Sequence, residues 1–165
     1  MTAGMAPVIG IPLGLDDRER WKPGRRYLYL DHRYVRAVEH AGGTPILLPL
    51  SGDPAALVAR IDALLLPGGD DFLPELAYDE PVAFDPAPDE QVAFDRALLE
   101  GARARGLPVL GICYGAQLIA LVHGGTLHHH LPLDRPGCAS SRTRGRPARP
   151  RGVRRGRQGA RRGRV

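Results

Sequence analysis

Four short runs of apolar residues mark the chain, and each is bounded by Gly, Pro or charged positions. They are too short for buried helices, and their continuous apolar character is typical of strands that are covered on both faces. The predicted strands span residues 8–13, 44–50, 63–66 and 108–112, and we expect a further short strand over residues 126–131.

Amphipathic segments lie between these runs and predict helices. Asp31 is a suitable N-cap for a helix over residues 32–40, which should end before Gly42-Gly43. Asp53 followed by Pro54 starts a second helix, because Pro is favoured at the first helical position. Two more helices are expected over residues 89–105 and 116–122, and the segments 14–26 and 67–88 are predicted loops.

Strands and helices alternate along the chain, and this order decides the predicted fold class. A parallel strand pair needs a crossover connection, and strands buried on both faces need helices on both sides of the sheet. With right-handed crossovers the result is an α/β sandwich of three layers with a mostly parallel sheet. Ligands bind such sheets at the carboxyl ends of the strands.

Charge separates the end of the chain from the rest. Residues 135–165 hold 12 of the 23 basic residues and none of the 18 acidic ones. The net charge of +5 therefore comes from this tail, since residues 1–134 hold 11 basic against 18 acidic side chains. A tail of Arg, Gly, Pro, Ala and Ser buries too little apolar area to offset its ordering entropy. We expect a folded domain over 1–134 and a disordered tail over 135–165.

The composition also bounds the compartment and the partners. Two cysteines form no disulfide framework and fit a reducing environment. No signal peptide is evident, and the most apolar run, 108–122, is too short to span a bilayer. We expect a soluble cytoplasmic protein without a membrane partner. A nucleic-acid partner is not expected either, because the basic tail lacks the aromatic residues that stack on bases.

The strongest chemical signal follows the predicted strand 108–112. The residues Gly111-Ile112-Cys113-Tyr114-Gly115 form a Gly-x-Cys-x-Gly pattern that leads directly into a helix, which is typical of a nucleophile elbow with Cys in place of Ser. Glycines are needed on both sides because side chains there would collide where strand and helix cross. Free N–H groups at a helix N-terminus stabilise a thiolate. We predict Cys113 as the nucleophile and the Tyr114 N–H as an oxyanion donor.

A second oxyanion donor should come from the loop after the strand 63–66, which reads Pro67-Gly68-Gly69-Asp70. Paired glycines let the backbone approach a substrate closely. We predict the Gly69 N–H as this donor and Gly68 as a substrate contact. Gln117 lies one helical turn beyond Cys113 and either lines the same pocket or is solvated.

Two other candidates have ordinary explanations. The run His128-His129-His130 suggests a metal, but adjacent side chains on a strand alternate faces and cannot all reach one ion. No Cys or carboxylate stands at ligand spacing beside them, so we expect no metal site. Cys138 lies in the tail and is expected to be an unpaired bystander.

Together these segments resemble the class I glutamine amidotransferase-like superfamily, and within it the γ-glutamyl-γ-aminobutyrate hydrolase group (peptidase family C26). The resemblance runs in order through residues 7 to about 133. The matching segments are 7–11, 41–49, 62–72 with Pro74 and Tyr78, 106–117 and 124–128.

The resemblance implies a flavodoxin-like fold and a Cys-His-Glu triad that hydrolyses a γ-glutamyl amide, a C–N bond, through a thioester. Cys113 carries over as the nucleophile, and Gly69 and Tyr114 as the oxyanion donors. A small γ-glutamyl substrate, no metal or organic cofactor, and a role in polyamine (putrescine) catabolism are also implied, with homodimer formation left open. The group often has Arg at the position of Tyr114. Because the donor is a backbone amide, we expect this exchange to matter little for the chemistry.

One part of the family pattern is absent. The catalytic His and Glu of the group lie downstream of the nucleophile, and after His130 this chain has neither residue type. His32, His40 and His123 do not occupy the family position. General acid–base assistance is typically worth ~10²–10⁴-fold, so we expect impaired activity. We also expect a sheet that is incomplete at the C-terminus and a tail that arises from a frameshift, which translation of the other frames beyond codon 134 tests.

Several alternatives stay open. The chain is also compatible with the glutaminase half of an amidotransferase that passes ammonia to a partner. A second alternative is a non-catalytic remnant or binding module that keeps only the pocket. For the tail, the alternative to a frameshift is an authentic Arg/Gly segment that binds nucleic acid or anionic surfaces.

Overall fold

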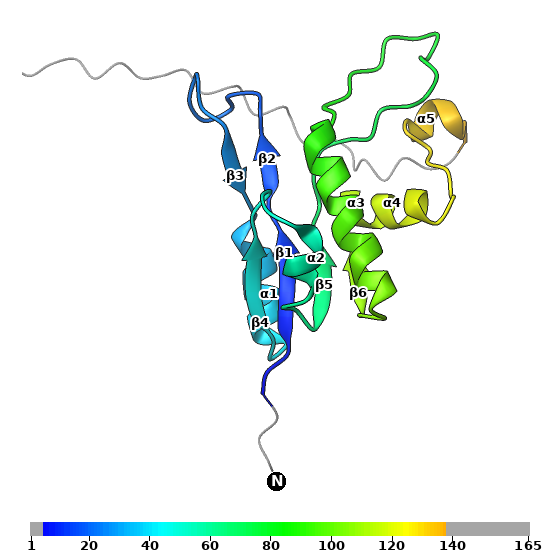
Figure 1. The fold of residues 1–165 in the computed structure, drawn as a ribbon. Coiled ribbons are helices and arrows are strands. Elements are labelled where there is room, and N and C mark those ends of the chain that lie inside the picture. The colour runs from blue at the N-terminus through cyan, green and yellow to red at the C-terminus, as the bar shows by residue number, and fades with distance from the viewer. Residues whose placement is uncertain (1–4, 138–165) are drawn as a thin grey trace, which may run out of the picture. The chain divides into compact units, whose positions relative to one another are not determined.

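A parallel four-stranded sheet forms the framework around the predicted nucleophile (Figure 1). In the computed structural model, which describes residues 5–137, its strand order is β4-β1-β5-β6. All three strand pairs are parallel, with Val8 opposite Thr44 and Leu64 opposite Val109. The strands are Val8–Pro12 (β1), Thr44–Leu48 (β4), Ala63–Leu66 (β5) and Val109–Gly111 (β6).

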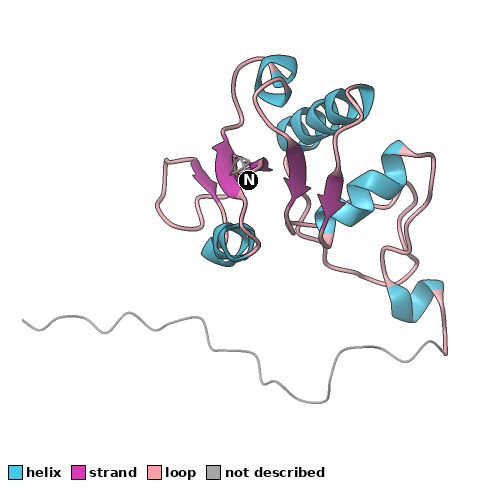
Figure 2. Ribbon diagram, turned by 90° about the horizontal axis from the view of Figure 1, so that it is seen from below, coloured by secondary structure: helices cyan, strands magenta, loops and turns pink. Residues whose placement is uncertain are grey.

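Helices cover both faces of this sheet (Figure 2). One face is covered by α1, and the other by α2 and α3, while α4 packs against β5, β6 and α3. Asp31 and Asp53 cap α1 and α2 as predicted, each accepting a backbone hydrogen bond at 2.9 Å. The helices are His32–His40 (α1), Pro54–Val58 (α2), Asp89–Ala104 (α3) and Tyr114–Val122 (α4). The predicted three-layer α/β sandwich is therefore confirmed.

The side chains of β5 show why this strand is a continuous apolar run. Leu64 and Leu66 are buried in the core formed with α2, α3 and α4. Leu65 points to the opposite face, where it packs with Ile11 and Val38. Successive strand residues face opposite sides, so a strand between two helical layers needs an apolar residue at every position.

The predicted loop over residues 14–26 is wrong at its beginning, where residues 14–16 form a strand. Gly14–Asp16 (β2) pairs antiparallel with Tyr27–Tyr29 (β3), so this segment is a hairpin with a long connection. Each strand has only three residues, and β2 ends on the polar Asp16, which is fully buried. Short strands with a buried carboxylate lack the apolar signal on which the prediction depended.

The strand predicted over residues 126–131 is also wrong, because residues 126–130 form no regular element. Their polar groups bind the long loop before α3 instead. His129 Nδ1 lies 2.9 Å from the Phe72 carbonyl oxygen, and the His130 N–H donates to Tyr78 Oη at 3.1 Å. A smaller difference is that α4 begins at Tyr114, two residues earlier than predicted.

The chain divides into two units, Met1–His130 and Leu131–Val165. The described part of the second unit consists of a short helix, Leu131–Asp134 (α5), and a turn. Most of the predicted tail over 135–165, including Cys138, lies outside the described residues, so its disorder stays a prediction. Among the described helices, none has the length and apolar character needed to cross a membrane.

Candidate active site

Cys113 occupies the turn where β6 ends and α4 begins, at the carboxyl edge of the sheet. Its backbone angles are φ 50° and ψ −109°, and among the described non-glycine residues only Glu19 shares a positive φ. A side-chain residue in this region is strained, and such strain is typical of a nucleophile held on a sharp turn. The Cys113 thiol is free and exposed.

The glycines on either side of Cys113 fulfil the predicted steric requirement. A Cβ on Gly111 would lie 2.6 Å from the backbone of Gly115 and Ala116. A Cβ on Gly115 would lie 2.3 Å from the carbonyl oxygen of Leu66 in β5. Side chains at these two positions would separate strand from helix, which confirms why the sequence has glycine at both.

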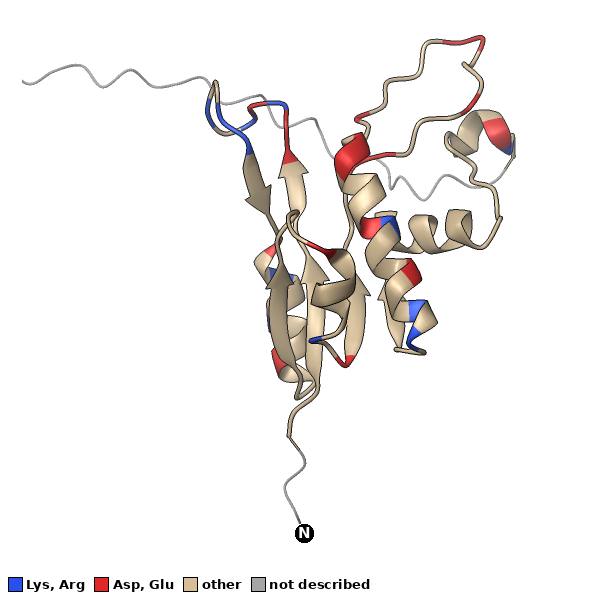
Figure 3. Ribbon diagram, in the orientation of Figure 1, with Lys and Arg blue, Asp and Glu red and all other residues tan. Residues whose placement is uncertain are grey.

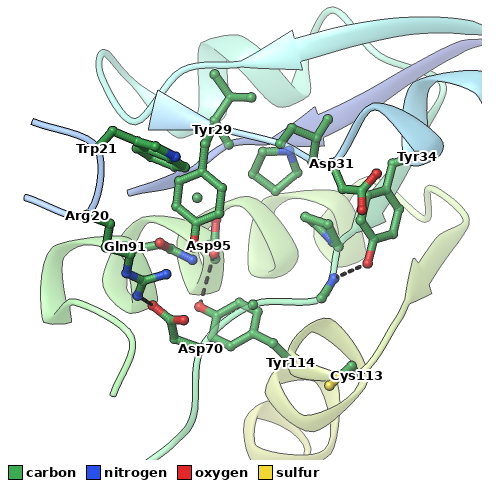
Figure 4. Close-up of a pocket in the computed structure, with 17 residues that line it drawn as sticks. Arg20, Trp21, Tyr29, Asp31, Tyr34, Asp70, Gln91, Asp95, Cys113 and Tyr114 are labelled. Carbon is green, nitrogen blue, oxygen red and sulfur yellow. Dashed lines mark hydrogen bonds and ion pairs between the residues drawn. The ribbon is translucent and has the colours of Figure 1, made fainter. Parts of the chain in front are cut away.

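A cavity of about 650 Å³ lies beside Cys113, within the size range of small-molecule sites (Figure 4). Its walls come from separate segments of the first unit. The connection between β2 and β3 contributes Arg20 and Trp21, and β3 contributes Tyr29. The loop after β5 and the elbow contribute residues 67–70 and 113–114.

The structure brings the four predicted residues of the elbow and the glycine loop together. A Cβ on Gly68 would lie 3.5 Å from Cys113 Cβ, and one on Gly69 would lie 3.2 Å from Tyr114 Cγ. The Gly68 N–H donates to Tyr34 Oη at 2.9 Å. Within residues 5–137, the N–H groups of Gly69 and Tyr114 have no acceptor. These two amides are therefore open to a ligand, as an oxyanion hole requires.

Gln117 is the predicted site residue that the structure places apart from this group. It is half-buried on α4, and its N–H donates to the Cys113 carbonyl oxygen at 2.9 Å. It is not among the residues that line the cavity. A role for Gln117 in substrate binding stays a prediction.

A buried polar pair at the base of the cavity was not predicted. The Tyr114 hydroxyl donates to Asp95 Oδ2 at 3.0 Å, and both residues are almost fully buried. Burial raises the pKa of Asp95 to about 7, against the opposing effect of hydrogen bonds from Tyr114 and Gln91. Burial also raises the pKa of the Tyr114 phenol above its ordinary value. The sequence offers only a weak signal for this pair, an acidic residue within the apolar pattern of α3.

An ionic network fixes the connection between β2 and β3 next to the glycine loop. Asp70 accepts from Arg18 at 3.2 Å and also pairs with Arg20. The buried Asp16 accepts from the backbone N–H groups of Arg18 at 3.2 Å and Arg20 at 2.9 Å. Arg18 further contacts Asp85 at 3.0 Å. Figure 3 shows the basic residues of this connection and the acidic residues near the start of α3.

No described histidine lines the cavity of Cys113. His40 and His123 lie 2.6 and 2.7 Å from carbonyl oxygens of their own helices, those of Arg36 and Ile119. Residues 5–137 also contain no cluster of three His, Cys, Asp or Glu side chains that could hold a metal ion. The imidazole that a Cys-His-Glu triad needs is thus not among the described pocket residues.

Comparisons with known proteins agree with this geometry. The model of the Peptidase C26 family matches residues 7–150, which extends past Asp134, where the motif resemblance ends. The "Putative glutamine amidotransferase Rv2859c" of Mycobacterium tuberculosis is 39% identical over 136 residues, covering 76% of this chain and 42% of that protein. The "Gamma-glutamyl-gamma-aminobutyrate hydrolase PuuD" of Escherichia coli K12 is 35% identical over 133 residues, covering 76% and 49%.

The chain therefore spans about half the length of the curated relatives that it matches. It is also similar to a solved structure described as a "putative gmp synthase subunit a protein" from Thermoplasma acidophilum. That match covers 72% of this chain and 46% of the other, with 24% sequence identity and a TM-score of 0.43.

Proposed function

This chain belongs to the Peptidase C26 family, and we propose that it forms the nucleophile-bearing part of a cysteine hydrolase that cleaves γ-glutamyl amides. The observation that supports this most directly is the strained elbow of Cys113 beside the open N–H groups of Gly69 and Tyr114. A relative named γ-glutamyl-γ-aminobutyrate hydrolase supports the same bond type. The bond cleaved is a C–N bond other than a peptide bond.

The proposed chemistry proceeds through a thioester. The Cys113 sulfur adds to the γ-carbonyl carbon, and the carbonyl electron pair moves onto oxygen, where the Gly69 and Tyr114 amides receive it. The carbonyl then re-forms as the C–N bond breaks, and the amine leaves with a proton from solvent, to which the thiol has lost its own. Water hydrolyses the thioester to glutamate and the free thiol. The described pocket residues include no histidine to supply that proton, so leaving-group departure should limit the rate for ordinary alkyl amines.

The charges of the cavity suit the glutamyl part of such a substrate. A γ-glutamyl group carries an ammonium and a carboxylate on one carbon atom. The cavity wall presents a guanidinium, Arg20, beside the carboxylate of Asp70 (Figure 4). Both signs of charge are therefore within the same cavity as the nucleophile, which favours a small zwitterionic substrate over a long apolar one.

The test uses the full chain with γ-glutamyl-p-nitroanilide, whose weakly basic leaving group needs little protonation. We expect slow release of p-nitroaniline and a γ-glutamyl thioester on the Cys113 peptide, detected by mass spectrometry at mildly acidic pH. Cys113→Ala should abolish both signals. Equal release by wild type and Cys113→Ala, or no adduct on Cys113, would contradict the proposal and leave a non-catalytic binding module as the better account.

A further inference from the structure

The side chain of Tyr114 takes an unexpected position for a residue next to an exposed nucleophile. Only 1% of Tyr114 is accessible, and its ring stacks on Phe72 with centroids 4.9 Å apart and planes 1° from parallel. Its hydroxyl reaches α3 and donates to the buried Asp95. The ring thus runs beneath the cavity, from the elbow to the opposite helix (Figure 4).

The same ring also supports the glycine loop. A Cβ on Gly69 would lie 3.2 Å from Tyr114 Cγ and 3.4 Å from Tyr114 Cβ and Cδ1. The backbone of Gly69 therefore packs against Cβ, Cγ and Cδ1 of Tyr114. One of the two proposed oxyanion amides belongs to Tyr114 itself, and the other belongs to the residue that this side chain contacts.

From this arrangement we infer that the Tyr114 side chain, held by its hydrogen bond to Asp95, is a positioning group that sets the spacing between the two oxyanion amides. The inference rests on the proposed function, because it assigns the amides of Gly69 and Tyr114 to an oxyanion. It differs from the expectation that the side chain at this position matters little. The Tyr114 donor is a backbone amide, but the second donor, the Gly69 amide, belongs to a residue that packs against the Tyr114 side chain.

Packing alone does not account for the polar ends of this pair. A Phe ring at position 114 would fill the same volume and stack on Phe72 without a hydroxyl, and an apolar side chain at position 95 would leave no carboxyl to bury. Taking these two polar groups out of water is costly. A hydrogen bond from the hydroxyl adds what stacking lacks, because it fixes how deeply the ring enters and how it is turned. Amides aimed at an oxyanion need such accuracy, since removal of one donor typically costs ~10²–10³-fold in rate.

The test compares two reactions of the Cys113 thiol in the full chain, each quantified on the Cys113 peptide. p-Nitrophenyl acetate acylates the thiol: the C–S bond forms, the carbonyl pair moves to oxygen, p-nitrophenolate leaves, and the thiol proton goes to solvent. Iodoacetamide alkylates the same sulfur by displacing iodide and places no charge on the oxygen of an attacked carbonyl. The ratio of the two rate constants therefore reports the oxyanion site separately from thiol reactivity.

We expect this ratio to fall about tenfold in Tyr114→Phe and in Asp95→Ala, with no further loss in the double variant. Asp95→Asn should restore a ratio near that of the wild type, because an amide oxygen still accepts from the hydroxyl. Circular dichroism and urea midpoints establish that each variant is folded. An unchanged ratio in folded Tyr114→Phe and Asp95→Ala overturns the inference.

This test does not depend on γ-glutamyl specificity. p-Nitrophenyl acetate is a generic acyl donor, so a chain that fails to react with γ-glutamyl-p-nitroanilide can still show or lack the ratio change. Equal ratios in wild type and every variant would count against the positioning role alone. Loss of the γ-glutamyl reaction with a retained ratio change would count against the proposed substrate alone.

Discussion

A Cβ built on Gly115 would lie 2.3 Å from the carbonyl oxygen of Leu66, because α4 crosses β5 at the backbone of this glycine. The close approach sets the glycine backbone against a main-chain oxygen of β5, so no rotation of a side chain can relieve the clash that a Cβ would cause. It fixes how closely the amino end of the elbow helix approaches the sheet, and thereby where Cys113 stands.

Gly115→Ala should destabilise the fold by about 3 kcal/mol, since α4 must move away from β5 to admit the methyl group. Gly101→Ala is the matched control: Gly101 lies inside α3, and a Cβ there would meet Val58 at an ordinary 3.5 Å. Because Ala is the better helix residue, this variant should gain ~0.5–1 kcal/mol. Urea denaturation measures both. A Gly115→Ala midpoint at or above the wild-type value would contradict the close crossing.

The strain at Cys113 predicts that the Gly and Ala substitutions at this position differ in stability. Cys113→Gly removes the penalty for φ 50° and ψ −109°, which for a residue with a side chain is about 1–3 kcal/mol. Glycine also loses more entropy on folding, by ~0.5–1 kcal/mol. The Gly variant should therefore be about 1 kcal/mol more stable than Cys113→Ala, which retains the strain. Equal urea midpoints for the two variants would show that the elbow is relaxed.

Much of this fold could be predicted because its signals are local. The run of apolar residues in β5, the caps Asp31 and Asp53, and the glycines around Cys113 each reflect a requirement within a few positions of the chain. The elbow is the clearest case, since strand end, nucleophile and helix start occupy one short segment. Only the position of the helix start differs, because Tyr114 and Gly115 already have helical geometry.

The remaining parts depend on contacts between distant positions. Asp95 lies on α3 and Tyr114 on α4, and the two side chains can form a hydrogen bond only because these helices pack together. The Tyr34 hydroxyl likewise meets the Gly68 N–H across 34 positions of the chain. In neither pair does the sequence around one residue indicate which residue is its partner.

The burial of Asp95 predicts how stability depends on pH. Its pKa is about 7 in the folded protein, above the ordinary value of 3.8, so the folded state binds more protons than the unfolded state between these values. The stabilisation from the protonated carboxyl is fully present below pH ~4 and is lost as pH rises through 7. A shift of about three pKa units corresponds to a few kcal/mol.

Asp95→Asn should remove this dependence because the amide does not ionise. As pH rises from 5 to 8, we expect the urea midpoint of the wild type to decrease and that of Asp95→Asn to decrease less. The two plots of midpoint against pH should cross or converge toward low pH. All other ionisable groups are common to both proteins, so their contributions cancel in the comparison. Parallel curves would mean that Asp95 is already ionised at pH 5.

The ionic network around Asp70 predicts where the cavity wall opens first. Asp70 pairs with Arg18 and Arg20, and both arginines lie in the long connection between β2 and β3. Each such partly exposed pair contributes ~0.2–1 kcal/mol. Asp70→Asn should therefore make local opening of this connection about fivefold more frequent at low salt. Trypsin cleaves after Arg, so cleavage after Arg18 and Arg20 should accelerate by that factor.

Glu75→Gln is the control for this experiment, because it makes the same change of charge at an exposed position with no ion pair among residues 5–137. It should leave the rate of cleavage after Arg18 and Arg20 unchanged. High salt should raise the wild-type rate toward that of Asp70→Asn, since screening weakens the pairs that the substitution removes. Acceleration of equal size in both variants would show that net charge, rather than the Asp70 pairs, controls access. Equal cleavage in wild type and Asp70→Asn would show that the backbone hydrogen bonds to Asp16 hold this wall without Asp70.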